Sequence, residues 1–187
     1  MQVHKRHAFT AWEYHQMAAA GILREGDRVE LWDGEILEMS PIGSRHAATV
    51  DRLTAWLSRE LGGRAIVRVQ SPIGLSRYSE PQPDLVLLKP RPDFYASAHP
   101  GPEDVWLLME VAESSLEYDR NFKLPRYAEA GIVESWIVDL PGQRLWVYRQ
   151  PVGRNYQSIR EYQPSDSLSP QAFPSASLAL REILECG

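Results

Sequence analysis

Hydrophobic and polar residues alternate with a period of two in several parts of the chain, which predicts β-strands. The segment 29–39, VELWDGEILEM, has two alternating arms around Asp33-Gly34, a dipeptide typical of a tight hairpin turn. Three further strand-like runs are separated by loops rich in Pro, Gly and Ser: RAIVRVQSPI (64–73), PDLVLLKP (83–90) and DVWLLMEVAE (104–113). We expect these runs to form a central meander, followed by a strand pair with a Pro-Gly turn in 134–149.

Two shorter segments carry the signals of helix ends. In residues 9–23, Thr10 and Glu13 have the spacing of a capping box, and the glycine after the alanine run supplies a left-handed stop. The segment 118–132, YDRNFKLPRYAEAGI, predicts another helix, which ends at Gly131.

The longest predicted helix begins at Ser44, as its N-cap, and runs to Leu61, where Gly62-Gly63 ends it. At 100° per residue, one arc of this helix carries the apolar positions and also His46. The other members of the arc are Val50, Leu53, Thr54, Leu57 and Leu61. A separate stripe carries Arg45, Arg52 and Arg59.

The order helix, strands, helix, strands predicts an α/β or α+β fold, with helices packed on a central mixed sheet. The chain after about residue 150 is polar and weakly patterned until SASLALREIL (175–184), which predicts a terminal helix capped by a serine. A length of 187 residues fits one domain, and no inter-domain linker interrupts 1–187.

Composition narrows the class of protein. With 43% hydrophobic and 24% charged residues the chain is typical of a folded globular protein. The single cysteine, Cys186, allows no intramolecular disulfide and no cysteine-based zinc site, which favours a reducing, cytoplasmic setting. We expect no membrane partner, since there is neither a signal-peptide pattern nor a run approaching about 20 apolar residues. A net charge of −5 argues against a protein that coats nucleic acid by bulk electrostatics.

Two acids stand at the ends of apolar strands. Asp84 opens the run 85–88, and Glu110 closes the run that follows it. A carboxylate at the end of a buried strand is unfavourable in free energy unless it is paired, exposed or bound to a cation. If neighbouring strands bring the two acids together, a divalent cation such as Mg²⁺ would relieve their repulsion. The alternative is that Asp84 caps a turn and Glu110 bonds to a nearby arginine.

A lysine follows Glu110 in the chain and could face the same end of the sheet. Lys123 is thirteen residues beyond Glu110, near the start of the next helix, and could stabilise charge that builds on a phosphate. It could equally form a surface ion pair with Asp119, four residues earlier. Pro125 leaves open whether Asp119, Lys123 and Tyr127 share one face, because proline disfavours helix in the residue before it.

The ordered set of these segments resembles the PD-(D/E)XK nuclease superfamily, and specifically the Uma-type restriction endonuclease family, a former domain of unknown function. The segments that carry the resemblance are PQPDLVLL, LLMEVAESS, DRNFKLPRYAEAGIVESWIVD and the upstream VELWDGEILEMSPIGSRHAATVDRL. It spans about residues 8–150, which leaves 151–187 as a C-terminal extension. It implies a restriction-endonuclease-like fold with an N-terminal helix and hairpin.

The resemblance also implies roles for individual residues. Asp84 and Glu110, with the backbone carbonyl of Val111, would hold Mg²⁺ or Mn²⁺, and a lysine would serve the attacking water. The superfamily motif places that lysine two residues after Glu110, where this chain has Ala112. In the Uma-type branch the lysine comes from the following helix, which implies Lys123.

Further positions could support such a site. His46 and Glu30 match the family and are candidate metal ligands, although His46 could be a hydrogen-bonded core residue and Glu30 an exposed strand acid. Gln70 could donate to a water or a phosphate, or simply bond within a turn. Asp119 and Tyr127 could support the lysine. The three arginines of the long helix could contact phosphate or form a solvated face.

The sequence therefore predicts a Mg²⁺- or Mn²⁺-dependent endonuclease that hydrolyses phosphodiester bonds of nucleic acid, with DNA as the expected substrate. Two rivals remain. One is a catalytically inactive nuclease-fold module for nucleic-acid binding or assembly, and the other is a carboxylate-pair hydrolase of the glycosidase kind. We expect a homodimer, because cutting both strands of a duplex commonly needs two active sites and aromatic residues are abundant. Trp136 and Trp146 are candidates for core or dimer contacts.

Overall fold

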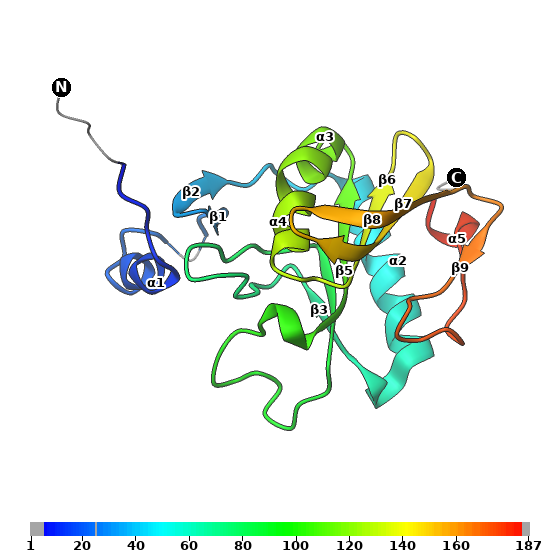
Figure 1. The fold of residues 1–187 in the computed structure, drawn as a ribbon, viewed down its shortest axis with the longest axis horizontal. Helices are drawn as coiled ribbons and strands as arrows, with labels where there is room; N and C mark the ends of the chain where they lie inside the picture. Colours follow the sequence, from blue (N-terminus) through cyan, green and yellow to red (C-terminus); the bar gives the residue numbers. More distant parts are fainter. Residues whose placement is uncertain (1–5, 25, 185–187) are drawn as a thin grey trace.

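A six-stranded sheet forms the centre of the protein in the computed structural model, which describes residues 6–24 and 26–184 (Figure 1). Its strands follow the order of the chain: β3 (Ile66–Val69), β4 (Leu85–Leu88), β5 (Val105–Ala112), β6 (Glu134–Asp139), β7 (Arg144–Val152) and β8 (Asn155–Tyr162). All neighbours are antiparallel except β5 and β6, which are parallel. The predicted meander and strand pair are confirmed, and so is the mixed α/β fold.

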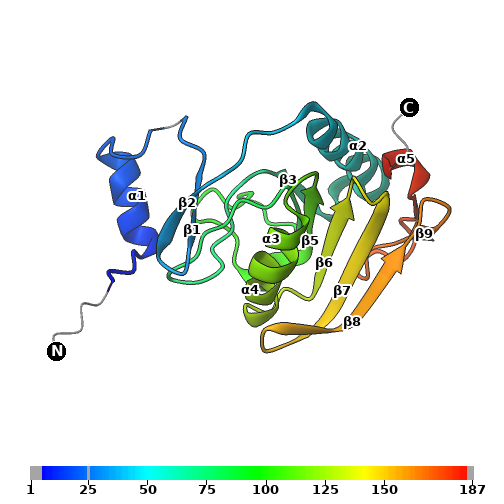
Figure 2. The same ribbon diagram turned by 90° about the horizontal axis from the view of Figure 1, so that it is seen from above.

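Alternation along the strands gives the sheet two apolar faces. In β4, Leu85 and Leu87 belong to one buried cluster, whereas Val86 and Leu88 belong to the other. The first cluster includes residues of α2 (Ser44–Leu61) and α5 (Arg181–Leu184), and the second includes residues of α4 (Leu124–Glu129). Helices therefore cover both faces of the sheet (Figure 2).

Helix α2 begins one residue differently from the prediction. Its N-cap is Gly43, which has an extended backbone, and no side chain caps the helix, so Ser44 is the first helical residue. The apolar arc itself is confirmed, since Val50, Leu53 and Leu57 are all buried.

The predicted capping box and hairpin are present at one end of the molecule (Figure 2). Thr10 and Glu13 cap α1 (Ala11–Ala19) reciprocally, yet no residue of α1 is buried. Strands β1 (Val29–Trp32) and β2 (Glu35–Glu38) form their own antiparallel pair. Both turn residues, Asp33 and Gly34, have positive φ, as a type I′ hairpin requires.

The connection from β5 to β6 is a helix with an irregular middle. A short α3 (Leu116–Tyr118) continues through a π-helical turn (Asp119–Lys123) into α4. Pro125 is the second residue of α4 and has no amide proton for an i→i−4 hydrogen bond. The widened turn just before it accommodates that loss, and such turns are frequent at functional sites.

The C-terminal part departs from the prediction. Strand β8 was not predicted, because this edge strand buries only Tyr156 and so lacks an alternating signal. The terminal helix predicted over 175–184 is wrong for most of its length. Leu178–Ala179 forms β10, which pairs with β9 (Ser167–Leu168), and only Arg181–Leu184 is helical, without a serine cap. Cys186 lies outside the described residues.

None of the helices in the described part of the chain is long and apolar enough to cross a membrane. The cytoplasmic location and the single-domain organisation stay predictions.

Candidate active site

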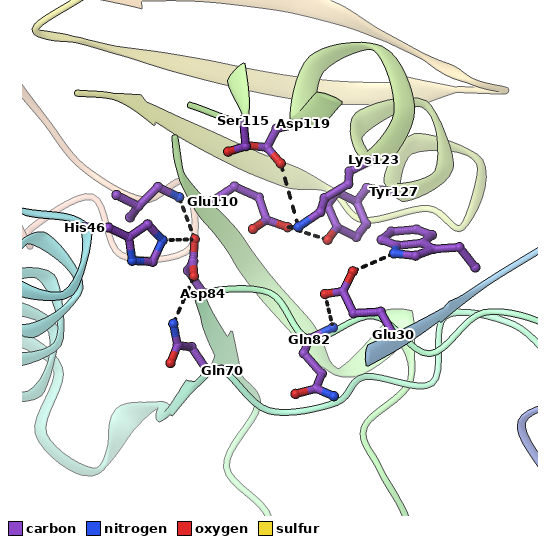
Figure 3. A network of polar contacts seen from close by, with 12 residues as sticks. Glu30, His46, Gln70, Gln82, Asp84, Glu110, Ser115, Asp119, Lys123 and Tyr127 are labelled. Carbon is purple, nitrogen blue, oxygen red and sulfur yellow. Dashed lines mark hydrogen bonds and ion pairs between the residues drawn. The ribbon is translucent and has the colours of Figure 1, made fainter. Parts of the chain in front are cut away.

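The pairing of β4 with β5 brings the two strand-end acids together. Leu85 pairs with Met109 in antiparallel register, so the next position on each strand sets Asp84 opposite Glu110. Side chains opposite each other in an antiparallel pair have Cβ atoms about 4.5–5.5 Å apart. The two carboxylates therefore lie at the same end of the sheet, as predicted (Figure 3).

Asp84 is held by three donors from different elements. Val111 donates its backbone N–H to Oδ2 at 2.8 Å, and His46 Nε2 lies 3.0 Å from the same oxygen. Gln70 Nε2 donates to Oδ1 at 3.3 Å, from a residue with positive φ just after β3. Burial raises the pKa of Asp84, but the hydrogen bond and charge of His46, with the Val111 amide, outweigh it and lower the pKa below its ordinary value.

His46 points from α2 toward the acids, which confirms its predicted orientation (Figure 3). The hydrogen bond to Asp84 raises its pKa, although partial burial acts in the opposite direction. Its Nδ1 is buried and has no hydrogen-bond partner among the described residues. The imidazole therefore holds Asp84 on one side and leaves a polar atom unsatisfied on the other.

Glu110 is deeply buried, and two side chains of the π-helical turn and α4 contact it. Tyr127 donates its hydroxyl to Oε1 at 2.6 Å, and Lys123 Nζ lies 3.2 Å from the same oxygen. Burial raises the pKa of Glu110 to about 8, with a further increase from Asp119 and a partial offset from Lys123. Burial also raises the pKa of Tyr127 well above its ordinary value, so its hydroxyl remains a donor.

Lys123 faces the acid end of the sheet and also pairs with Asp119, but that pair is buried and is not the surface pair of the alternative. Its Nζ lies 3.2 Å from Glu110 Oε1 and 3.7 Å from Asp119 Oδ1. Burial lowers the pKa of Lys123, but the surrounding carboxylates, led by Glu110, raise it overall, so the ammonium stays charged. Asp119 is itself buried and accepts a hydrogen bond of 2.6 Å from Ser115 Oγ. Lys123 and Tyr127 thus converge on Glu110, and Asp119 lies beside Lys123 (Figure 3).

Glu30 is not an exposed strand acid, because it is only 4% exposed. Trp32 Nε1, two residues along the same face of β1, donates to Oε2 at 2.7 Å. The backbone N–H of Gln82 donates to Oε1 at 3.0 Å, and the Gln82 side chain donates to Val29 O at 3.1 Å. The hairpin therefore adds a further fixed carboxylate, besides Asp84, Glu110 and Asp119, to the site.

One pocket of about 160 Å³ is lined by Glu30, His46, Asp84, Glu110, Asp119 and Lys123, whereas Gln70 and Tyr127 contact the acids without lining it. It also contains residues that the sequence analysis did not select: Arg28, Gln82, Glu113, Ser115 and Tyr118. Gln82 and Ser115 have clear roles, since they orient Glu30 and Asp119 respectively. The signal that could have found them is their place next to predicted site residues, in Gln82-Pro83-Asp84 and in the loop after Glu110.

The three arginines of α2 are not grouped in this pocket. Arg45 donates to Leu140 O at 2.9 Å and ties α2 to the end of β6. Arg59 forms an exposed ion pair of 3.1 Å with Glu60, and Arg52 lies on the exposed side of the helix. Phosphate contact by these residues stays a prediction.

The donor set suits a hard divalent cation. The carboxyl groups that line the pocket, among them Asp84, Glu110, Glu30 and Asp119, outnumber its basic side chains, Arg28, His46 and Lys123. Mg²⁺ binds through one or two carboxylates together with waters and substrate phosphates. The facing pair of Asp84 and Glu110 fits that pattern, and Val111, between them, lines the same pocket.

The six-stranded mixed sheet, its helices on both faces and the acid pair at the end of β4 and β5 define a restriction-endonuclease-like α/β protein. A family model, Uma2, described as "Putative restriction endonuclease", matches residues 11–181. The chain belongs to the Uma2 family, which confirms the resemblance found in the sequence.

A solved structure shares this fold. It is the crystal structure of a "putative nuclease belonging to DUF820" from Anabaena variabilis ATCC 29413, 16% identical in sequence. The superposition covers 94% of this chain and 97% of that chain with a TM-score of 0.71. No curated protein matches the sequence.

Proposed function

We propose that the protein is a metal-dependent endonuclease that hydrolyses phosphodiester bonds of nucleic acid, with DNA as substrate. The observation that carries the proposal is the facing pair of Asp84 and Glu110, with the buried ammonium of Lys123 3.2 Å from Glu110. Membership of the Uma2 family supports the same activity.

In the proposed site, Asp84, Glu110 and the backbone carbonyl of Val111 hold Mg²⁺ or Mn²⁺, and Glu30 and His46 are further candidates. A bound cation would supply Lewis-acid stabilisation of the charge on a scissile phosphate and would lower the pKa of a water. The chain's own donors keep the acids in place before any ligand arrives. They are the Val111 amide and His46 on Asp84, and Tyr127 on Glu110.

Lys123 has the role of orienting the attacking water and stabilising negative charge that develops on the phosphate. Its ammonium remains protonated because carboxylates surround it, so it acts as a donor and not as the base. Asp119, fixed by Ser115, holds the lysine from the side opposite Glu110. A preorganised charge of this kind needs no rearrangement at the moment of reaction.

The activity is tested with supercoiled plasmid, single-stranded DNA and RNA, incubated with purified protein and either Mg²⁺ or Mn²⁺. We expect nicking that requires one of these ions and that stops when a chelator is added in excess. A protein that binds nucleic acid but cleaves none of the three substrates with either ion would contradict the proposal and favour the binding module.

We also propose that two copies associate, since hydrolysis of both strands of a duplex calls for two sites. Of the two roles predicted for Trp136, the structure places it in the core, where it is fully buried. Support comes from the edge strand β8, where Ile159 is 53% exposed, and from Val152, the last residue of β7, which is 62% exposed. Sedimentation velocity at micromolar concentration should show a dimer, and Ile159→Lys should shift it to monomer. A wild-type monomer would contradict the proposal.

A further inference from the structure

A second cluster of metal-ligating side chains lies outside the candidate active site. It combines His15 of α1, Glu80 of the loop before β4 and His99 of the loop after β4. One donor atom from each residue lies within 4.8 Å of the other two. Within 6–24 and 26–184, no other three His, Cys, Asp or Glu side chains meet this distance, including those of the candidate active site.

The distances between the donor atoms of the cluster are close to those between the ligand atoms of a bound metal ion. His15 Nε2 lies 2.8 and 3.0 Å from the two carboxylate oxygens of Glu80, and the His15 and His99 rings have centroids 5.7 Å apart. Ligand atoms around a tetrahedral zinc ion, at about 2.0–2.2 Å from the metal, are roughly 3.3 Å apart. A contraction of at most roughly 1.5 Å is therefore needed, which rotation of exposed histidine side chains can supply.

Two of the three ligands sit on backbone that is already anchored. The N–H of Glu80 donates to Leu31 O at 2.8 Å, and its side chain is only 6% exposed. Pro100, next to His99, accepts a hydrogen bond of 2.9 Å from the N–H of Gly74. A ligand set held by packed backbone loses less conformational freedom when it binds an ion.

The third ligand belongs to an element with few other attachments. Helix α1 has nine residues, none of them buried, and isolated helices of this length are marginal in water. Its links to the rest of the chain include Ala11 N–H to Arg77 O at 2.9 Å and the Tyr14 hydroxyl to Val29 O at 3.1 Å. A bond through His15 would therefore have a large effect on how firmly α1 is held.

We propose that His15, Glu80 and His99 bind Zn²⁺, which fastens α1 to the two loops that flank β4. Two imidazoles and one carboxylate form a donor set that zinc takes readily, whereas Mg²⁺ prefers oxygen ligands alone. Because both histidines are exposed, a water can take the fourth position. This zinc site is independent of the proposed nuclease activity.

The test is a titration of the full chain with ZnCl₂ by isothermal calorimetry, in the presence of excess Mg²⁺. We expect one zinc ion per wild-type chain, with affinity at least about 10-fold weaker in His99→Asn and in His15→Gln. His7→Asn is the matched control, because it removes an exposed histidine of the same segment that lies outside the cluster. Asp84→Asn, which alters the candidate active site, should bind zinc like wild type.

A second measurement, the Tm, tests whether zinc stabilises the folded protein. Zinc should raise the Tm of wild type and of His7→Asn but leave the Tm of His99→Asn unchanged, because only a ligand that binds the folded state stabilises it. Absence of stoichiometric zinc binding in wild type would overturn the proposal. So would zinc binding that survives in His99→Asn, including binding that depends instead on Asp84.

Discussion

Asp84→Asn is expected to reduce Mg²⁺- or Mn²⁺-dependent nicking of plasmid by at least about 10²-fold, which corresponds to roughly 2.7 kcal/mol of activation free energy. The substitution preserves the shape of the side chain and removes one unit of negative charge from the pair that faces the proposed cation. It also replaces one acceptor oxygen by an amide NH₂ group, so an asparagine oxygen that accepts from Val111 and His46 leaves its NH₂ facing the Gln70 Nε2 that now donates to Oδ1. DNA binding without metal should be unchanged or tighter, since a negative charge near the phosphates is lost.

Asp51→Asn provides the matched control, because it removes the same charge from the exposed surface of α2. This variant should nick plasmid like wild type, measured as the initial rate of supercoiled DNA loss. If Asp84→Asn cleaves as fast as Asp51→Asn, the acid pair does not take part in the reaction. If neither variant nor wild type cleaves and Asp84→Asn binds DNA more tightly, a nuclease-fold binding module is the better description.

Lys123→Met is expected to abolish detectable cleavage and to lower the free energy of unfolding by about 3 kcal/mol in metal-free buffer. Methionine keeps most of the buried stem but leaves Glu110 and Asp119 without their cationic partner. The expected loss of stability lies at the low end for a broken buried ion pair, because Glu110 can take up a proton. Denaturant unfolding gives the stability, and nicking below the unfolding transition gives the activity.

Lys89→Met is the control for the change of residue type. Its ammonium lies over the ring of Trp106, with the nitrogen 5.0 Å from the ring centroid, and because both residues are partly exposed the contact is worth about 1 kcal/mol. This variant should lose no more stability than that and should cleave normally. A Lys123→Met protein that is as stable as wild type and still cleaves would remove Lys123 from the proposed mechanism.

Part of the candidate site could be predicted from the local pattern of the sequence. Asp84 and Glu110 could be selected because each interrupts an apolar run, and a buried strand does not tolerate an unpaired charge. His46 could be selected because it falls on the apolar arc of a regular helix. Glu30 was ambiguous, since an alternating strand reveals which residues share a face but not which face is covered. Contact with Trp32 and Gln82 resolved that ambiguity.

The two wrong predictions in the C-terminal part, the missed strand β8 and the helix over 175–184, also arose because local pattern does not show which strands pair. Strand β8 exposes most of its residues, so the sequence carries no alternating signal, and its pairing with β7 supplies the order that local pattern lacks. In 175–184 the apolar residues fit a helix equally well, but pairing of β10 with β9 competes for the first part of the segment. Tertiary hydrogen bonds decided between two conformations of similar local propensity.

By itself the sequence determined the elements whose signals lie within a few residues of one another. These are the capping box of α1, the Asp33-Gly34 hairpin, the apolar arc of α2 and the aliphatic runs of the central sheet. Only the tertiary structure decided the register that sets Asp84 opposite Glu110, the π-helical turn that aims Lys123 at them, and the approach of His15 to Glu80 and His99. Such contacts join residues far apart in the chain, and their formation depends on the packing of whole elements, which no short window of sequence encodes.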